Sequence, residues 1–148
     1  AASHPPAPHP DARGGAQAMA DAMKEARYCG KDVVYINAHG TGTPMNDIVE
    51  TAAIKKALGG EQAKKAFVSS TKSMTGHMLG AAGAVEALAC LFALNEGVIP
   101  PTIHLDEQDE RCDLNCAPNA AVHADITLAL SNSLGFGGHN ACLAFRKV

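Results

Sequence analysis

Apolar and polar residues follow one another in blocks along the chain, and the spacing within each block predicts a helix or a strand. The stretch 16–27 puts its methionines on one stripe with charged residues opposite, which predicts an amphipathic helix. The run of β-branched and aromatic residues at 33–37 predicts a buried strand. A second helix is expected from Asn46 to about Leu58, where two glycines would end it.

The second half of the chain continues this alternation. A short strand is predicted at 66–70, and the run at 78–94 is apolar on every side, which predicts a buried helix. Residues 97–125 are mostly loop, and two closing strands are expected at 126–133 and 140–148. This order predicts an α/β fold, a mixed sheet with helices, whose last two strands are antiparallel.

The length of the chain indicates one domain, residues 1–148, because 148 residues is typical of a single folding unit. Residues 1–15 contain four prolines, which block helix formation, so we expect them to be an extended lead-in to the domain. The chain does not begin with methionine. We therefore expect it to continue a longer polypeptide.

Composition and charge exclude several classes of partner. The net charge is -3 without a run of basic residues, which argues against binding nucleic acid or an anionic membrane surface. The apolar run at 78–94 is shorter than a typical membrane span of about 20 residues and contains Glu86, so no membrane span is expected. Of the five cysteines, Cys112 and Cys116 form a lone pair without further ligands, so no metal site is predicted and a reduced cytoplasmic setting is expected.

The first candidate for chemistry is His39, which directly follows the strand predicted at 33–37. Binding sites in open α/β sheets form where parallel strands end, although a histidine there can also be purely structural. The hydroxyls of Thr41 and Thr43 lie in the glycine-rich turn that follows, where such residues are also ordinary turn formers.

A second group of candidates lies between the strand at 66–70 and the apolar helix. Lys72 and His77 fall in a loop of Ser, Thr and Gly residues, and Glu86 is the only charge in the helix that follows. A buried carboxylate needs a partner, and Lys72 is the expected one. This pair can be structural or part of a site.

The third candidate is the turn between the two closing strands. Gly135 and Gly137 flank Phe136, and glycines let the backbone turn tightly and leave its N–H groups free to bind an oxyanion. Taken alone, the stretch is more typical of a plain glycine-rich hairpin.

Together the stretches NAHGTGTP, STKSMTGHMLGAAGAVE and NSLGFGGHN resemble, in sequence and in order, three signature motifs of the β-ketoacyl-[acyl-carrier-protein] synthases. The resemblance runs from about residue 7 to the end of the chain and is similar to the bacterial elongating enzymes of type II fatty acid synthesis. It implies the C-terminal half of a thiolase-like fold with αβαβα layers. The implied reaction is the decarboxylative condensation of malonyl-acyl carrier protein with an acyl-enzyme thioester.

The resemblance also implies a role for each candidate residue. His39 and His77 match the catalytic pair, and Lys72 with Glu86 matches a supporting ion pair. Thr41 and Thr43 match hydroxyls that bind the phosphopantetheine arm of the acyl carrier protein. Phe136 matches a gating residue whose backbone contributes to an oxyanion hole, supported by Gly135 and Gly137. Asp47 and Glu50 match acidic residues behind the first histidine loop.

No cysteine of this chain lies in the family's nucleophile motif, so the nucleophile is expected in an absent first half. The resemblance then implies that this chain alone is inactive, that its partners are its N-terminal half and acyl carrier protein, and that the intact enzyme is a homodimer. It implies no cofactor beyond the carrier's phosphopantetheine. Two alternatives stay open, namely a polyketide ketosynthase piece and a non-catalytic fragment that only binds partner protein.

Overall fold

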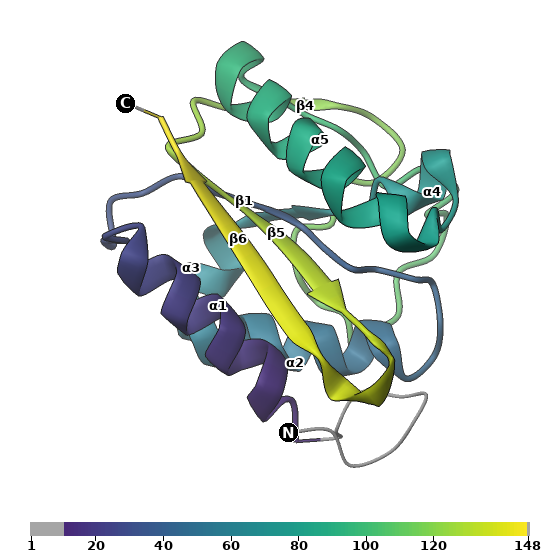
Figure 1. The fold of residues 1–148 in the computed structure, drawn as a ribbon. Coiled ribbons are helices and arrows are strands. Elements are labelled where there is room, and N and C mark those ends of the chain that lie inside the picture. The colour runs from purple at the N-terminus through teal and green to yellow at the C-terminus, as the bar shows by residue number, and fades with distance from the viewer. Residues whose placement is uncertain (1–10, 148) are drawn as a thin grey trace.

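The computed structural model describes residues 11–147 and arranges them as a four-stranded sheet with helices on both faces (Figure 1). In chain order the elements are α1 (Arg13–Glu25), β1 (Val34–Asn37), α2 (Asn46–Leu58), α3 (Gly60–Lys65), β2 (Phe67–Ser69), α4 (Lys72–Thr75), η1 (Leu79–Ala81), α5 (Ala82–Glu96), β3 (Val98–Ile99), β4 (Val122–His123), β5 (Leu128–Leu134), η2 (Phe136–Gly138) and β6 (Asn140–Arg146).

The sheet is mixed and has the strand order β2-β1-β5-β6. β1 is parallel to β2 on one side and to β5 on the other, and β5 pairs with β6 in antiparallel register from Leu128↔Arg146 to Leu134↔Asn140. The predicted α/β fold with an antiparallel ending is therefore confirmed. The carboxyl ends of the three parallel strands lie at one edge of the sheet, which is the edge that carries the candidate residues.

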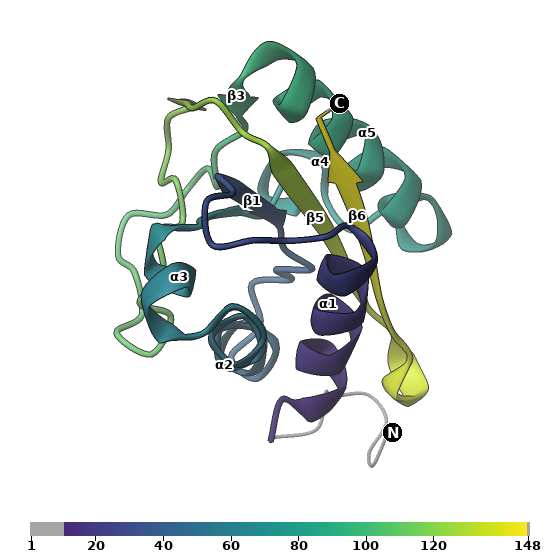
Figure 2. The same ribbon diagram turned by 90° about the vertical axis from the view of Figure 1, so that its left-hand side faces the viewer.

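Two hydrophobic cores lie on opposite faces of the sheet (Figure 2). On one face Met19 of α1 and Ile54 of α2 belong to the same hydrophobic core as Ile36 of β1. On the other face α5 packs through Cys90, which meets Tyr35 of β1. All four residues of β1 are buried because both faces of the strand are covered.

Several predicted boundaries are wrong. Helix α1 already begins at Arg13, so residues 13–15 are helical and not extended; residues 1–10 lie outside the described residues. The chain turns at Gly59 (φ 82°) and immediately forms a second short helix, α3, where only a stop was predicted. Strands β3 and β4 form a small antiparallel pair within the stretch 97–125 that was predicted as mostly loop.

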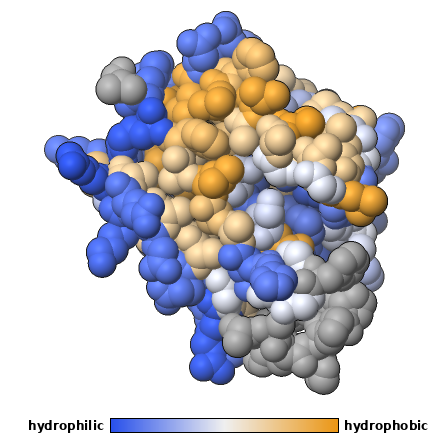
Figure 3. Space-filling view, in the orientation of Figure 1, coloured by the Kyte–Doolittle hydropathy of each residue, from blue (hydrophilic) through white to orange (hydrophobic). Residues whose placement is uncertain are grey.

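Helix α5 is buried on one side only, which corrects the prediction of a fully buried helix. Cys90 is buried against the sheet, whereas Leu88 and Phe92 are 54% and 65% exposed. Apolar side chains gather over α5 in the space-filling view (Figure 3). By length and composition alone, Leu79–Glu96 could cross a membrane, but a helix from the core of a soluble protein also meets that test. The apolar pattern predicted the helix correctly, but its burial is limited to the side that faces the sheet.

Candidate active site

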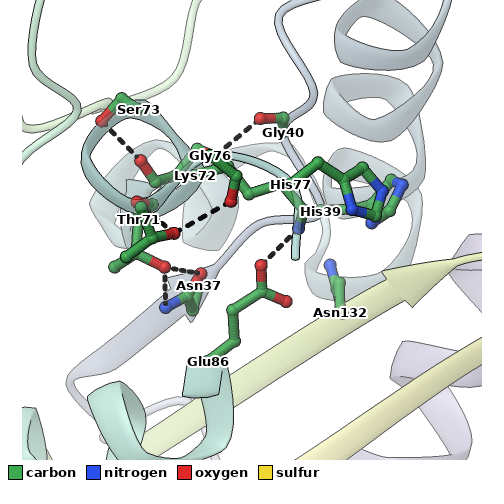
Figure 4. Close-up of polar contacts among 12 residues, drawn as sticks. Asn37, His39, Gly40, Thr71, Lys72, Ser73, Gly76, His77, Glu86 and Asn132 are labelled. Carbon is green, nitrogen blue, oxygen red and sulfur yellow. Dashed lines mark hydrogen bonds and ion pairs between the residues drawn. The ribbon is translucent and has the colours of Figure 1, made fainter. Parts of the chain in front are cut away.

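The two candidate histidines lie side by side although 37 residues separate them in sequence (Figure 4). His39 follows β1, and His77 follows the short helix α4 that comes after β2. Their ring centroids are 5.5 Å apart and the ring planes are nearly perpendicular, at 84°. Because β1 and β2 are parallel neighbours, their carboxyl ends bring both histidine segments to the same point.

The imidazole of His39 is held in its neutral form. Partial burial, the nearby positive charge of Lys72 and the proximity of His77 together lower the pKa of His39 to about 4, and burial has the largest effect. At pH 7 the ring therefore carries one proton and can donate one hydrogen bond.

A backbone contact fixes the orientation of the second ring. The N–H of Leu79 donates a hydrogen bond to Nδ1 of His77 over 3.1 Å. A neutral ring that accepts at Nδ1 carries its proton at Nε2, which leaves Nε2–H as the available donor. The site therefore presents two imidazoles, one of them in a defined tautomer.

Lys72 and Glu86 form a buried ion pair beneath the histidines, as the sequence predicted. Their side chains are only 5% and 3% exposed, and Lys72 Nζ contacts Glu86 Oε1. Glu86 Oε2 has no hydrogen-bond partner among residues 11–147. Lys72 begins the helix α4, so the stretch predicted as loop contains a helical turn that points the ammonium inward.

The carboxylate of Glu50 holds the backbone of the first histidine loop. Its Oε1 accepts the N–H of His39 (2.8 Å), and its Oε2 accepts the N–H of Gly40 (2.9 Å). Two side-chain amides also donate to it, from Asn46 (3.4 Å) and Asn132 (3.2 Å). Burial raises the pKa of Glu50, while these N–H donors favour the charged form and oppose that rise.

The two histidine loops are also tied directly to each other. Ser70, which follows β2, donates a hydrogen bond from its hydroxyl to the carbonyl oxygen of Gly40 over 2.6 Å. Gly40 has φ 40°, and a Cβ at this position would lie 2.5 Å from the Cβ of Ser70. Only glycine allows the two loops to approach this closely.

The remaining predicted residues of the first loop lie at the mouth of the site. The hydroxyls of Thr41 and Thr43 are 2.9 Å apart and form a hydrogen bond. Asp47 lies in the first turn of α2, and its carboxylate accepts a hydrogen bond from the side chain of Asn46. A cavity of about 560 Å³ opens here, and its lining includes Thr41, Asp47, Glu50, Lys72 and His77.

The third loop forms a compact turn rather than a set of free backbone donors. The N–H of Gly135 donates to the carbonyl of His139 over 2.7 Å and the N–H of Gly138 donates to the carbonyl of Gly135 over 3.2 Å, so these two N–H groups are used within the turn, while the predicted Phe136 N–H donor stays a prediction. Gly137 has φ 75°, which explains why a glycine is needed there. The side chain of Phe136 lies outside the described part of the structure, and its predicted role as a gate stays a prediction.

Sequence reasoning missed the polar residues that join these loops. The hydroxyl of Thr71 and the amide of Asn37 form a buried hydrogen bond that links the ends of β1 and β2. Ser70, Asn46 and Asn132 all contact the first histidine loop or its carboxylate. Each lies in or next to a recognised motif, but no local pattern shows which polar side chains meet in space.

The cysteines do not form part of this group of residues, although two of them line the cavity. Burial raises the pKa of Cys90 and of Cys142 to about 12 and that of Cys116 to about 11, and it also raises the pKa of Cys112. Cys29 is exposed. Within residues 11–147 no three His, Cys, Asp or Glu side chains are placed to share a metal ion.

The sheet is mixed, and two histidines follow the carboxyl ends of its parallel strands above a buried Lys–Glu pair. This arrangement is that of the C-terminal half of a thiolase-like fold. The chain belongs to the family described as "Beta-ketoacyl synthase, C-terminal domain", whose model matches residues 1–106. It is 53% identical over 146 residues to "3-oxoacyl-[acyl-carrier-protein] synthase 2" of Staphylococcus aureus (strain COL), covering 99% of this chain and 35% of the relative.

Solved structures agree with this assignment. The chain matches "The ishigamide ketosynthase/chain length factor" with a TM-score of 0.90 and 39% identity, covering 99% of this chain and 35% of that one. It matches a ketosynthase solved with its type II PKS acyl-carrier protein with a TM-score of 0.90 and 38% identity, over 96% of this chain and 35% of that one. The chain thus spans about a third of the length of the relatives that it matches.

Proposed function

We propose that this chain supplies the two-histidine part of the active site of a β-ketoacyl-[acyl-carrier-protein] synthase of fatty acid synthesis. The observation that carries the proposal is the pair of imidazoles 5.5 Å apart, with His39 neutral and His77 set to donate from Nε2. Two N–H donors side by side suit an oxygen that gains negative charge during a reaction.

In the proposed reaction both rings donate to the thioester carbonyl oxygen of a malonyl group. The bond between the α-carbon and the carboxylate breaks, carbon dioxide leaves, and the electron pair forms an enolate whose oxygen the two N–H groups stabilise. The enolate carbon then attacks the acyl thioester on the enzyme's cysteine, and that thiolate leaves. The cysteine comes from the N-terminal half of the same enzyme, so the chain alone is proposed to be inactive.

The other residues support these two donors. Burial and, after it, the positive charge of Lys72 keep His39 neutral, and Glu86 compensates the Lys72 charge in the buried layer below. Glu50, with Asp47 beside it at the start of α2, fixes the backbone of the loop.

Two sets of residues are proposed to contact the substrate directly. Thr41, which lines the cavity, and Thr43, whose hydroxyl forms a hydrogen bond with that of Thr41, would bind the phosphopantetheine arm. The turn at Gly135, Phe136 and Gly137 would gate the acyl site and contribute the Phe136 backbone N–H to the oxyanion hole.

Two protein partners are proposed for this chain. The exposed apolar side of α5, which includes Leu88 and Phe92, is proposed to be covered by the N-terminal half of the enzyme. Acyl carrier protein is the proposed substrate carrier, since a ketosynthase of similar fold has been solved in complex with its own carrier protein. A homodimer in the cytoplasm is the proposed state of the intact enzyme.

A role in polyketide synthesis is the second candidate, because one of the similar structures is a ketosynthase with its type II PKS acyl-carrier protein and another is a ketosynthase with a chain length factor. Their identity of 38–39% is lower than the 53% shared with the fatty acid enzyme, which favours the first candidate. The chemistry at the two histidines is the same in both proposals.

The test is to measure the two half-reactions separately in the full-length enzyme. We expect His39→Ala and His77→Ala each to slow malonyl decarboxylation by about 10²–10³-fold, since each removes one donor to the enolate oxygen. Transfer of the acyl group onto the cysteine should change much less. The matched control is His123→Ala, an exposed histidine on β4. Normal decarboxylation in either variant would remove that histidine from the proposed role.

A further inference from the structure

The first residue of the third motif, Asn132, points away from the turn and into the core beneath the first histidine loop. It is 2% exposed and lies on β5. Its Nδ2 donates to Glu50 Oε1 over 3.2 Å and lies 3.3 Å from Sδ of Met19 in α1. The next residue, Ser133, faces the other side of the sheet, where a Cβ on Gly83 of α5 would meet its hydroxyl at 3.5 Å.

The oxygen that Asn132 contacts is the one that holds the backbone of His39. Glu50 Oε1 accepts both the His39 N–H and the Asn132 amide, and Oε2 accepts the Gly40 N–H. Without further contacts, the side chain of Glu50 could rotate about its own bonds and carry the loop with it. The donor on β5 restricts that rotation because it comes from the sheet and not from the helix that carries Glu50.

The orientation of the Asn132 amide is set by its hydrogen bond to Glu50. Nδ2 faces the carboxylate, and Oδ1 is buried without a partner among the described residues. Turning the amide over would place Oδ1 against a carboxylate oxygen, and two acceptors repel each other.

We propose that Asn132 is a positioning residue for His39, which it holds in place through the Glu50 carboxylate. The proposal rests on the proposed function, in which His39 donates to the enolate oxygen, and it links the third motif to the first. A displacement of about 1 Å far from the reacting atoms can lower a rate by about 10²-fold. Loss of the Asn132 donor should therefore weaken decarboxylation without removing any group that touches the substrate.

Two variants separate the hydrogen bond from the volume of the side chain. Asn132→Leu keeps a side chain of similar size but removes the donor. Asn132→Asp keeps the shape but places a second carboxyl group against Glu50, where two carboxylates this close share a proton. We expect both variants of the full-length enzyme to slow malonyl decarboxylation by about 10–10²-fold, with a smaller change in acyl transfer. Ser133→Ala, on the opposite face of the same strand, is the control and should change neither.

Amide hydrogen exchange in the same variants tests positioning without relying on activity. We expect faster exchange at His39 and Gly40 in both Asn132 variants and unchanged exchange in Ser133→Ala. Adding Asn132→Leu to Glu50→Gln should slow decarboxylation no further, because the proposed effect passes through Glu50.

The outcomes separate this proposal from the proposed function. Faster exchange at His39 with selectively slowed decarboxylation supports it. Unchanged exchange overturns it, and so does an equal loss in both half-reactions with a lower melting temperature, which would mark Asn132 as structural only. If the wild-type enzyme does not decarboxylate malonyl thioesters, the proposed function fails, and exchange at His39 alone then decides whether Asn132 positions this loop.

Discussion

Replacing Glu86 by glutamine isolates the charge of the buried ion pair. Glutamine has nearly the same size and shape as glutamate, so Glu86→Gln opens no cavity and leaves the packing of α5 on the sheet intact. It removes the negative charge opposite Lys72, whose side chain is only 5% exposed. The ammonium then has no counter-charge in a place that water barely reaches.

The size of the effect follows from the two ways in which the protein can respond. Breaking one partner of a buried pair costs about 3–5 kcal/mol when the remaining charge stays in place. A lysine without a counter-charge can instead release its proton, which costs about 1.4 kcal/mol per pH unit below about 10.4, or roughly 4.6 kcal/mol at pH 7. Both routes predict a loss of about 3–5 kcal/mol in the free energy of unfolding.

The second route has a recognisable pH dependence. If the folded variant holds Lys72 without its proton, the unfolded chain binds one proton more than the folded chain. The stability of Glu86→Gln must then rise with pH relative to the wild type. The deficit should shrink by up to about 1.4 kcal/mol per pH unit between pH 7 and pH 9.

Urea unfolding of the full-length enzyme at pH 7 and pH 9 measures both the loss of unfolding free energy and its change with pH. Glu96→Gln is the matched control, because it removes an exposed carboxylate from the end of the same helix and should cost less than about 0.5 kcal/mol. The double variant Glu86→Gln/Lys72→Met should recover most of the loss, since no unpaired charge remains. A loss below about 1 kcal/mol at pH 7, or a double variant no more stable than Glu86→Gln, would refute the buried-pair reasoning.

Three further predictions address the loops and the surface. Gly40→Ala should lower stability and decarboxylation more than Gly42→Ala, because only the first adds a Cβ against Ser70; equal effects, measured side by side, would contradict the close approach. Lys72→Met should raise the pKa of His39 above about 4, measured by NMR titration, and an unchanged pKa would exclude the charge effect. Leu88→Ser should make the isolated chain more soluble but weaken its co-purification with the N-terminal half, whereas unchanged co-purification would leave that face without its proposed partner.

The regular part of the fold was predictable because periodicity reports burial directly. The strand at 33–37 and the helix from Asn46 to Leu58 agree with β1 and α2 to within a residue. The short elements were not predictable in the same way. α4 spans four residues and β3 two, so neither is long enough to show a period.

The candidate site likewise contains residues that the sequence identified and residues that it did not. His39, His77 and the pair of Lys72 with Glu86 were found because each stands out from its local surroundings, as a histidine after a strand or a charge in an apolar helix. Asn132 does not stand out, because an asparagine at the end of a strand is ordinary in sequence. Its contact with Glu50 joins residues 82 positions apart, and only the folded sheet brings them together.

The buried thiols have a practical consequence for chemical labelling of the intact enzyme. Alkylating reagents react with thiolates, and thiols with a pKa near 11 or 12, such as those of Cys90, Cys116 and Cys142, are almost entirely protonated at pH 7. Cys29 is exposed and Cys112 is partly exposed. In a Cys29→Ser/Cys112→Ser background, rapid loss of activity with iodoacetamide would report reactive thiols outside this chain, so a titration could measure how many nucleophilic cysteines each enzyme molecule carries.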